Sequence, residues 1–160
     1  MNYVKRKNAY GAYYVDIGIW DIVRKVNSVK TVVFDTGAVC TILDKVTLEA
    51  MGYEIDYTKS EKLNTAGGCI EMYHAVVQGF KLGTYNSETL KIGVANLSHL
   101  DVLGVLGMDF IDQFMWVIDT TNSCLAFEHQ ANLEENDEDV KNTLNLILKN
   151  NRRYKHWIYK

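Results

Sequence analysis

The stretch Val32-Val33-Phe34-Asp35-Thr36-Gly37-Ala38 decides the fold, because an apolar strand in it leads directly into an Asp-Thr-Gly turn. An ionisable aspartate at the end of a strand that looks buried costs free energy unless hydrogen bonds or a partner compensate for its desolvation. Such a carboxylate is more often functional than incidental. The triplet alone is a weak signal, since it arises by chance in roughly a few per cent of chains of this length. Asp35 is the first candidate for a catalytic residue.

Most of the chain is predicted to be β-structure. Between residues 12 and 20, Tyr13, Val15, Ile17 and Ile19 alternate with more polar or smaller residues, which is typical of a strand with one apolar face. The strand at 29–34 is apolar on both faces, as expected for a buried central strand. Further strands are predicted at 75–82, 89–95, 102–106, 115–119 and 124–128. Short strands at this spacing favour an all-β sandwich or barrel, whereas residues 1–10 look polar and loose.

One short helix is predicted directly after the Asp-Thr-Gly turn, within residues 42–52. Leu43, Val46, Leu48 and Met51 approximately fit one helical face. Asp44 suits the N-cap, and Gly52 suits the C-terminal end of the helix. We expect this helix to pack on the barrel.

A second stretch, residues 102–111 (VLGVLGMDFI), supports the first. Together the two resemble the retropepsin-like aspartic peptidases, the family of retroviral proteases and their bacterial relatives. The resemblance runs from about residue 12 to residue 127 and implies a closed all-β barrel with one or two short helices. It implies that Asp35 is catalytic, that the Thr36 hydroxyl bonds across a two-fold axis, and that Gly37 is the turn glycine. Leu103-Gly104 and Leu106-Gly107 are alternative registers for the element that supports the loop; the continuation through Asp109 favours the second.

The chain has one Asp-Thr-Gly turn, whereas hydrolysis by a carboxylate pair needs two aspartates. Asp119-Thr120-Thr121 lacks the glycine, so we interpret Asp119 as a strand-end residue. Asp109 is interpreted as a structural cap of a short helix at 110–114. The second catalytic carboxylate is therefore expected from a second copy of Asp35 in a homodimer with two-fold symmetry.

The resemblance also implies where a polypeptide substrate binds. The hairpin tip around Thr65, Ala66, Gly67 and Gly68 takes the place of the family's flap, with glycines where the chain must bend. Ala38 fills a position where relatives carry Ala or Ser. An alanine cannot donate a hydrogen bond to the carboxylate, so we expect a mildly acidic to near-neutral pH optimum.

Bulk properties bound the remaining choices. The net charge of -3 gives no support to nucleic-acid binding. Three scattered cysteines and four histidines show no metal-ligand spacing, and no metal or cofactor is expected. No apolar run is long enough for a membrane span, and the cysteine pattern is typical of reduced thiols in a cytoplasmic protein.

The composition shifts near residue 130, which divides the chain into a peptidase domain at 1–130 and an extension at 131–160. The extension combines a charged linker, an amphipathic helix and a basic, aromatic tail. The main alternative to an endopeptidase is a non-catalytic dimerisation or peptide-binding module with the same fold. A nucleic-acid or membrane adaptor acting through the tail is a second alternative.

Overall fold

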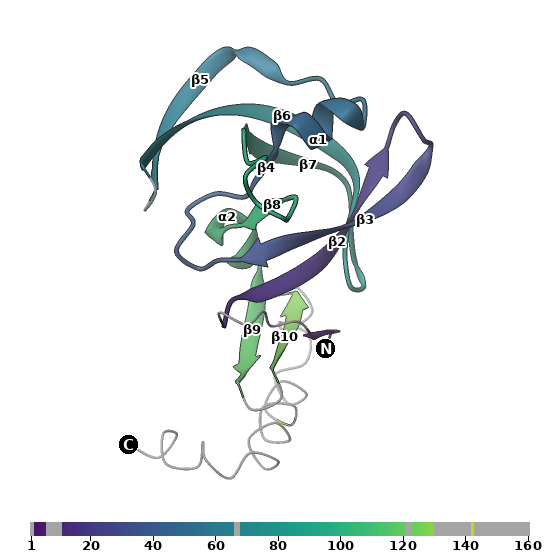
Figure 1. The fold of residues 1–160 in the computed structure, drawn as a ribbon. Coiled ribbons are helices and arrows are strands. Elements are labelled where there is room, and N and C mark those ends of the chain that lie inside the picture. The colour runs from purple at the N-terminus through teal and green to yellow at the C-terminus, as the bar shows by residue number, and fades with distance from the viewer. Residues whose placement is uncertain (1, 6–10, 66–67, 121–122, 130–141, 143–160) are drawn as a thin grey trace.

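The computed structural model describes residues 2–5, 11–65, 68–120, 123–129 and 142, which form two sheets and two short helices (Figure 1). A three-stranded sheet has the order β1 (Asn2–Lys5), β10 (Cys124–His129), β9 (Phe114–Asp119). The larger sheet has the order β2 (Tyr13–Asp21), β3 (Val26–Phe34), β8 (Gly104–Leu106), β4 (Ile42–Asp44), β7 (Tyr85–Ala95), β6 (Gly68–Leu82), β5 (Asp56–Thr65). The helices are α1 (Lys45–Ala50) and α2 (Met108–Ile111).

The larger sheet closes on itself. β2 pairs with β3 along its whole length and also meets β6 at the pair Gly18↔Lys81, so the six strands from β2 to β6 form a closed barrel. β5 lies outside this closure and pairs with β6 alone. The prediction of an all-β closed barrel with short helices is confirmed. The predicted C-terminal helical extension lies outside the described residues, apart from position 142.

The predicted strands are present, with differences in how they are buried. In β2, Val15, Ile17 and Ile19 are fully buried, as the alternating pattern predicts. In β3, the expectation of two buried faces is wrong: Val32 and Phe34 point into the core, but Val29 is 70% exposed. Only the end of β3 that pairs with β8 is a central strand, because Val29 lies beyond that pairing.

The helix after the Asp-Thr-Gly turn is shorter than its apolar pattern. Ile42 and Leu43 belong to β4, so the helical spacing that includes Leu43 is wrong, and Val46 is exposed. Asp44 does cap α1, because its side chain accepts a hydrogen bond from the Thr47 backbone N–H. Gly52 follows the helix with a φ of 88°, which explains the glycine there.

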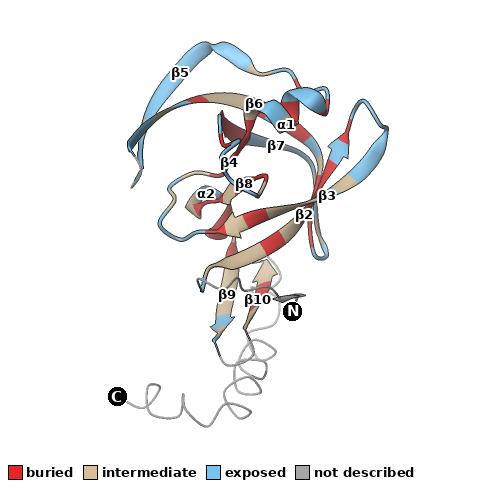
Figure 2. Cartoon of the chain, in the orientation of Figure 1, coloured by how far each residue is buried: buried red, intermediate tan, exposed pale blue. Residues whose placement is uncertain are grey.

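Two strands, β1 and β5, begin where sequence reasoning did not predict them. Residues 1–10 were expected to be loose, but Asn2–Lys5 forms β1 and pairs antiparallel with β10. β5 begins at Asp56, before any strand was expected, and pairs with β6 in a hairpin whose register shifts between Asp56 and Glu61. Nearly all of β5 is exposed, as the pale blue ribbon in Figure 2 shows.

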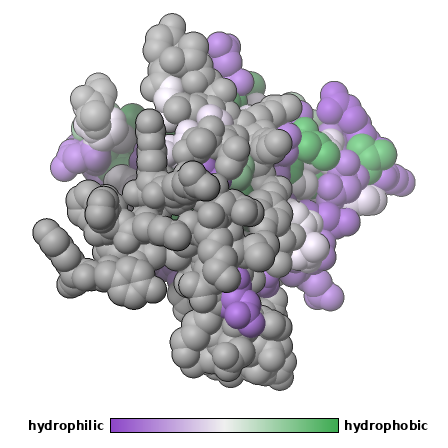
Figure 3. All heavy atoms as spheres, turned by 90° about the horizontal axis from the view of Figure 1, so that it is seen from below, coloured by the Kyte–Doolittle hydropathy of each residue, from purple (hydrophilic) through white to green (hydrophobic). Residues whose placement is uncertain are grey.

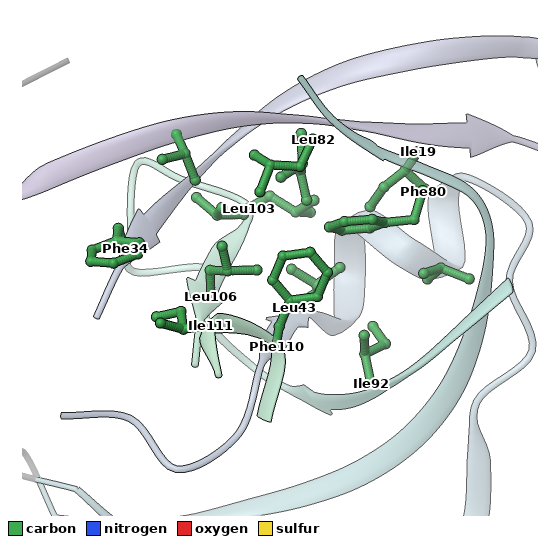
Figure 4. Close-up of a cluster of buried hydrophobic side chains, with 14 of the residues drawn as sticks. Ile19, Phe34, Leu43, Phe80, Leu82, Ile92, Leu103, Leu106, Phe110 and Ile111 are labelled. Atoms are coloured by element: carbon green, nitrogen blue, oxygen red, sulfur yellow. The ribbon is translucent and has the colours of Figure 1, made fainter. Parts of the chain in front are cut away.

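The core fills the barrel between its walls. Figure 4 shows side chains from β2, β3, β4, β6, β7, β8 and α2 meeting there, including Ile19, Phe34, Leu43, Phe80, Ile92 and Phe110. The β2–β3 hairpin instead exposes Ile22 and Val23 in its turn and Val26 at the start of β3. In Figure 3, seen from below, hydrophobic surface lies at the right-hand edge, the side to which this hairpin projects in Figure 1. The packed core makes the barrel a rigid base for the loop that follows β3.

Candidate active site

The loop at residues 35–41 is fixed to the barrel by backbone hydrogen bonds. β3 and β8 are parallel, with Phe34 opposite Leu106. The Asp35 N–H donates to the Leu106 carbonyl at 3.1 Å. Further along, Met108 N–H donates to the Ala38 carbonyl at 2.8 Å, and the next N–H donates to the Val39 carbonyl at 3.1 Å. The backbone that carries Asp35 is therefore held along its length by the start of α2 and the end of β8.

Asp35 itself lies at the surface of the protomer. The expectation that the strand buries this aspartate is wrong, because β3 ends at Phe34 and the turn carries Asp35, Thr36 and Gly37 out to exposed positions. Its Oδ1 accepts a hydrogen bond from the Gly37 N–H at 2.8 Å, and its carbonyl accepts one from the Ala38 N–H at 3.2 Å. The turn thus orients the carboxylate while leaving it accessible.

Gly37 lies close to the Asp35 carboxylate. A Cβ built at Gly37 would lie 3.1 Å from the Asp35 Oδ1. A side chain there would crowd the oxygen that the Gly37 N–H binds. The glycine of the triplet therefore makes room for the hydrogen bond between residues 35 and 37.

Thr41 joins the far end of the loop to α2. It is 1% exposed, and both its N–H and its Oγ1–H donate to Asp109 Oδ1 at 2.8 Å. The Thr41 Oγ1 also accepts a hydrogen bond from the buried Gly107 N–H at 3.1 Å. The prediction that Asp109 caps a helix is wrong: α2 is capped by Gly107 without a side-chain bond, and Asp109 lies in its first turn, facing Thr41.

The two alternative registers for the supporting element are resolved by β8. Leu106 lies opposite Phe34 and accepts the Asp35 N–H, so Leu106-Gly107 is the element beside the candidate catalytic loop. A Cβ at Gly107 would lie 2.4 Å from the Cys40 carbonyl carbon and oxygen. Gly104 is as tightly placed, since a Cβ there would lie 2.1 Å from the Ile42 carbonyl oxygen. The missing side chain lets Gly107 contact the backbone of the Asp35 loop at Cys40, and lets Gly104 contact the backbone of β4 at Ile42.

The β5–β6 hairpin reaches the same loop. A small apolar cluster contains Ile42, Met72, Ala95 and Leu97, with Cys40 from the loop and Leu63 and Ile70 from the hairpin packed against it. The Cys40 and Met72 sulfurs are 3.7 Å apart. The hairpin's inner face therefore contacts the loop that carries Asp35.

The hairpin end is partly described. Thr65 and Gly68 form its last pair, and the Thr65 Oγ1 donates to the Gly68 carbonyl at 2.7 Å. Gly68 has a φ of 123°, a conformation that favours glycine. Ala66 and Gly67 lie outside the described residues.

The Aspartyl protease family model matches residues 25–110, which is more than half of the 160-residue chain. The chain belongs to the aspartyl protease family. The matched region includes the Asp35 loop, the β5–β6 hairpin and the Leu106-Gly107 element. None of the curated protein sequences matches the chain.

The chain is also similar in fold to solved structures. The crystal structure of a retropepsin-like aspartic protease from Rickettsia conorii is similar, with a TM-score of 0.55 and 22% identity; the match covers 80% of this chain and 99% of that one. EIAV protease in complex with an inhibitor has a TM-score of 0.49 and 19% identity, over 67% of this chain and 91% of that one. The predicted retropepsin-like fold is confirmed.

We also looked in this aspartyl protease family member for pockets, metal sites and membrane-spanning helices away from Asp35. A pocket of about 590 Å³ is lined by residues of 52–56 and of β6, including Tyr53 and Val76, and by none of the Asp35 loop. Within the described ranges, no three His, Cys, Asp or Glu side chains gather in a way that would hold a metal ion. No helix in the same ranges is long and apolar enough to cross a membrane.

All three cysteines are free thiols. Burial, with smaller contributions from the charges of Asp109 and Glu61, raises the pKa of the Cys40 thiol. The thiol therefore stays protonated near neutral pH and is a poor nucleophile. In this protein Cys40 makes an apolar contact between the Asp35 loop and the β5–β6 hairpin. Sequence reasoning missed this role because Met72 is distant in the chain.

Proposed function

We propose that this protein is an aspartic endopeptidase that acts as a homodimer, with one Asp35 carboxylate from each copy. The observation that carries the proposal is the Asp-Thr-Gly turn, which a backbone fixed to β8 and α2 presents at the protomer surface. Membership of the aspartyl protease family supports it. One such turn per chain supports the need for a second copy, because an isologous dimer places identical residues about its axis.

The chemistry follows from two carboxylates that share one proton. Two like charges about 3 Å apart cannot both ionise cheaply, so one carboxylate stays protonated while the other is ionised. The ionised Asp35 takes a proton from a bound water, which attacks the peptide carbonyl carbon. The protonated Asp35 of the other copy donates to the carbonyl oxygen. Thr36 and Gly37 hold the paired turns in place, and the two carboxylates titrate as one unit.

The proposed substrate is an extended polypeptide between the Asp35 loops and the hairpins. Ala38, Thr65, Ala66, Gly67 and Gly68 are the proposed substrate-binding residues. Backbone groups of a hairpin can bind an extended chain as an added strand. The hairpin's contact with the loop through the cluster around Met72 supports its role as a cover that excludes water from the reacting bond.

The test compares wild type with Asp35→Asn, using Asp101→Asn as the matched control at an exposed aspartate before β8. Wild type and Asp101→Asn should cut a mixed peptide library, with a mildly acidic to near-neutral optimum. Asp35→Asn should dimerise in sedimentation but cut nothing. Full activity in Asp35→Asn would contradict the aspartic mechanism. Peptide binding by all three without cleavage would favour a peptide-binding module instead.

Mixing the variants tests whether the site is shared. At equal amounts of wild type and Asp35→Asn, random pairing leaves about one quarter of the dimers with two wild-type copies. Activity should therefore fall to about one quarter of that of wild type at the same total concentration, once the copies have exchanged. A value near one half would show that each protomer works alone.

The proposal also covers the domain organisation of the chain and the cellular compartment of the enzyme. We place the peptidase domain at residues 1–130 and the extension at 131–160, which lies outside the described residues apart from position 142. The three free cysteines support a reducing compartment such as the cytoplasm.

A further inference from the structure

The β5–β6 hairpin raises the question of what holds its outer strand in place. Among the described strands β5 is paired with β6 alone, and nine of its ten residues are exposed. Near the tip, Leu63 packs on the apolar cluster beside the Asp35 loop. At the other end, the pairing with β6 is interrupted between Asp56 and Glu61. The base of β5 is therefore paired with β6 less continuously than the tip, although Asp56 still lies opposite His74.

Tyr57 makes that contact with helix α1. Its hydroxyl donates to Glu49 Oε1, and the Lys45 ammonium lies 5.0 Å from the centre of its ring. On its other side, the Tyr57 ring meets the Tyr73 ring of β6 edge-on, with centroids 4.9 Å apart. Tyr57 thus joins α1 to both strands of the hairpin.

Helix α1 is itself firmly attached to the barrel. Leu48 on its inner face is fully buried. The carboxylate of Asp44 binds the Thr47 N–H at the start of the helix and the Leu97 N–H of the following segment, each at 2.9 Å. At the other end, the Met51 carbonyl accepts the Ile22 N–H at 3.0 Å. A hairpin joined to α1 is therefore joined to a fixed point.

We propose that Tyr57 is a positioning residue that sets the angle of the β5–β6 hairpin over the Asp35 loop through its hydrogen bond to Glu49 and its ring contact with Lys45, both on α1. The eight steps along the strand from Tyr57 to Thr65 span at most about 26 Å. A rotation of about 10° at Tyr57 would then move the tip by about 4 to 5 Å. A small rotation at the base of the hairpin therefore becomes a large displacement at its tip, where we expect the substrate to bind. In this respect the inference rests on the proposed function.

The first test needs no peptidase activity. In an Asp35→Asn background, trypsin cleavage after the exposed β5 residues Lys59 and Lys62 is followed by mass spectrometry, since cleavage requires the hairpin to open locally. Tyr57→Phe, which removes the bond to Glu49 and keeps the ring, should speed this cleavage by about two- to tenfold. Tyr73→Phe is the matched control, because it keeps the ring that meets Tyr57 and removes a hydroxyl from β6, leaving the Tyr57–Glu49 bond in place. Equal rates for the two variants would overturn the proposal.

Variants of Glu49 test the other partner of the bond. Glu49→Gln keeps an acceptor for the Tyr57 hydroxyl and should restore most of the protection that Glu49→Ala loses. Equal protection from trypsin in Glu49→Gln and Glu49→Ala would show that the hydrogen bond from Tyr57 does not hold the hairpin.

The second test uses the active enzyme. Tyr57→Phe should raise KM by about two- to tenfold with kcat unchanged, because a looser hairpin must be ordered when substrate binds. A fall in kcat with constant KM would contradict positioning by Tyr57. If the trypsin result holds while wild type cleaves no peptide, the role of Tyr57 stands and the proposed peptidase function fails.

Discussion

Thr41→Val is predicted to destabilise the protein by about 2 to 3 kcal/mol, although it conserves shape and volume. The Thr41 hydroxyl donates to Asp109 and accepts from the Gly107 N–H, so valine removes both bonds. An orphaned buried N–H costs about 1 to 3 kcal/mol, and water cannot easily replace the partner where Gly107 touches the Cys40 backbone. Losing the bond to the exposed Asp109 adds about 1 kcal/mol or less, because water can bind that carboxylate.

The assay is urea unfolding at one protein concentration, since a dimer's stability depends on concentration. Thr58→Val is the matched control: its hydroxyl also donates to a carboxylate, that of Asp56, but at an exposed site. We expect a loss of about 0.5 kcal/mol or less there, with an unchanged m-value in both variants. Thr41→Ser, which keeps the hydroxyl, should recover most of the loss. If Thr41→Val is no worse than Thr58→Val, the inferred role of the Thr41 hydroxyl is wrong.

Two further predictions concern Asp44 and Gly107. Burial alone would raise the pKa of Asp44, but hydrogen bonds from Thr47 and Leu97 outweigh it and lower the pKa. Its stabilising effect is therefore present above about pH 4, the unfolded value, and is lost as pH falls through the lowered folded value, so Asp44→Asn should flatten the acid limb of stability against pH. Gly107→Ala places a Cβ 2.4 Å from the Cys40 backbone and should lower stability by about 3 kcal/mol or more in thermal melts. Gly68→Ala, with an empty surrounding and a φ of 123°, should cost about 1 to 2 kcal/mol from backbone strain alone.

Local patterns predicted the fold well where the chain's own periodicity decides burial. The alternation in β2 and the cap at Asp44 depend on neighbours in sequence, and the structure has both. The patterns failed where a distant partner decides. Val29 and Val46 are apolar residues that stay exposed among the described elements, and β1 pairs with an edge of β10.

The candidate site shows the same division. The Asp-Thr-Gly turn and the hairpin are local signals and could be located from sequence. The exposure of Asp35 could not, because it depends on where β3 ends relative to β8. The bond between Thr41 and Asp109 joins residues 68 apart in the chain, and the spacing of the residues around Asp109 equally suited a helix cap. No sequence pattern predicted the contact between Tyr57 and Glu49, because both residues are exposed and a polar group on an exposed residue needs no partner within the protein.

The antiparallel pairing of β1 with β10 constrains how two copies of the chain can associate. Within one protomer, Asn2–Lys5 occupies an edge of β10 through four register pairs. A second copy can reach that edge only by displacing this segment with its own, which would preserve the same four pairs in an exchanged arrangement. Among the described strands β10 is the middle one of this sheet, so β1 and β9 carry its outer edges.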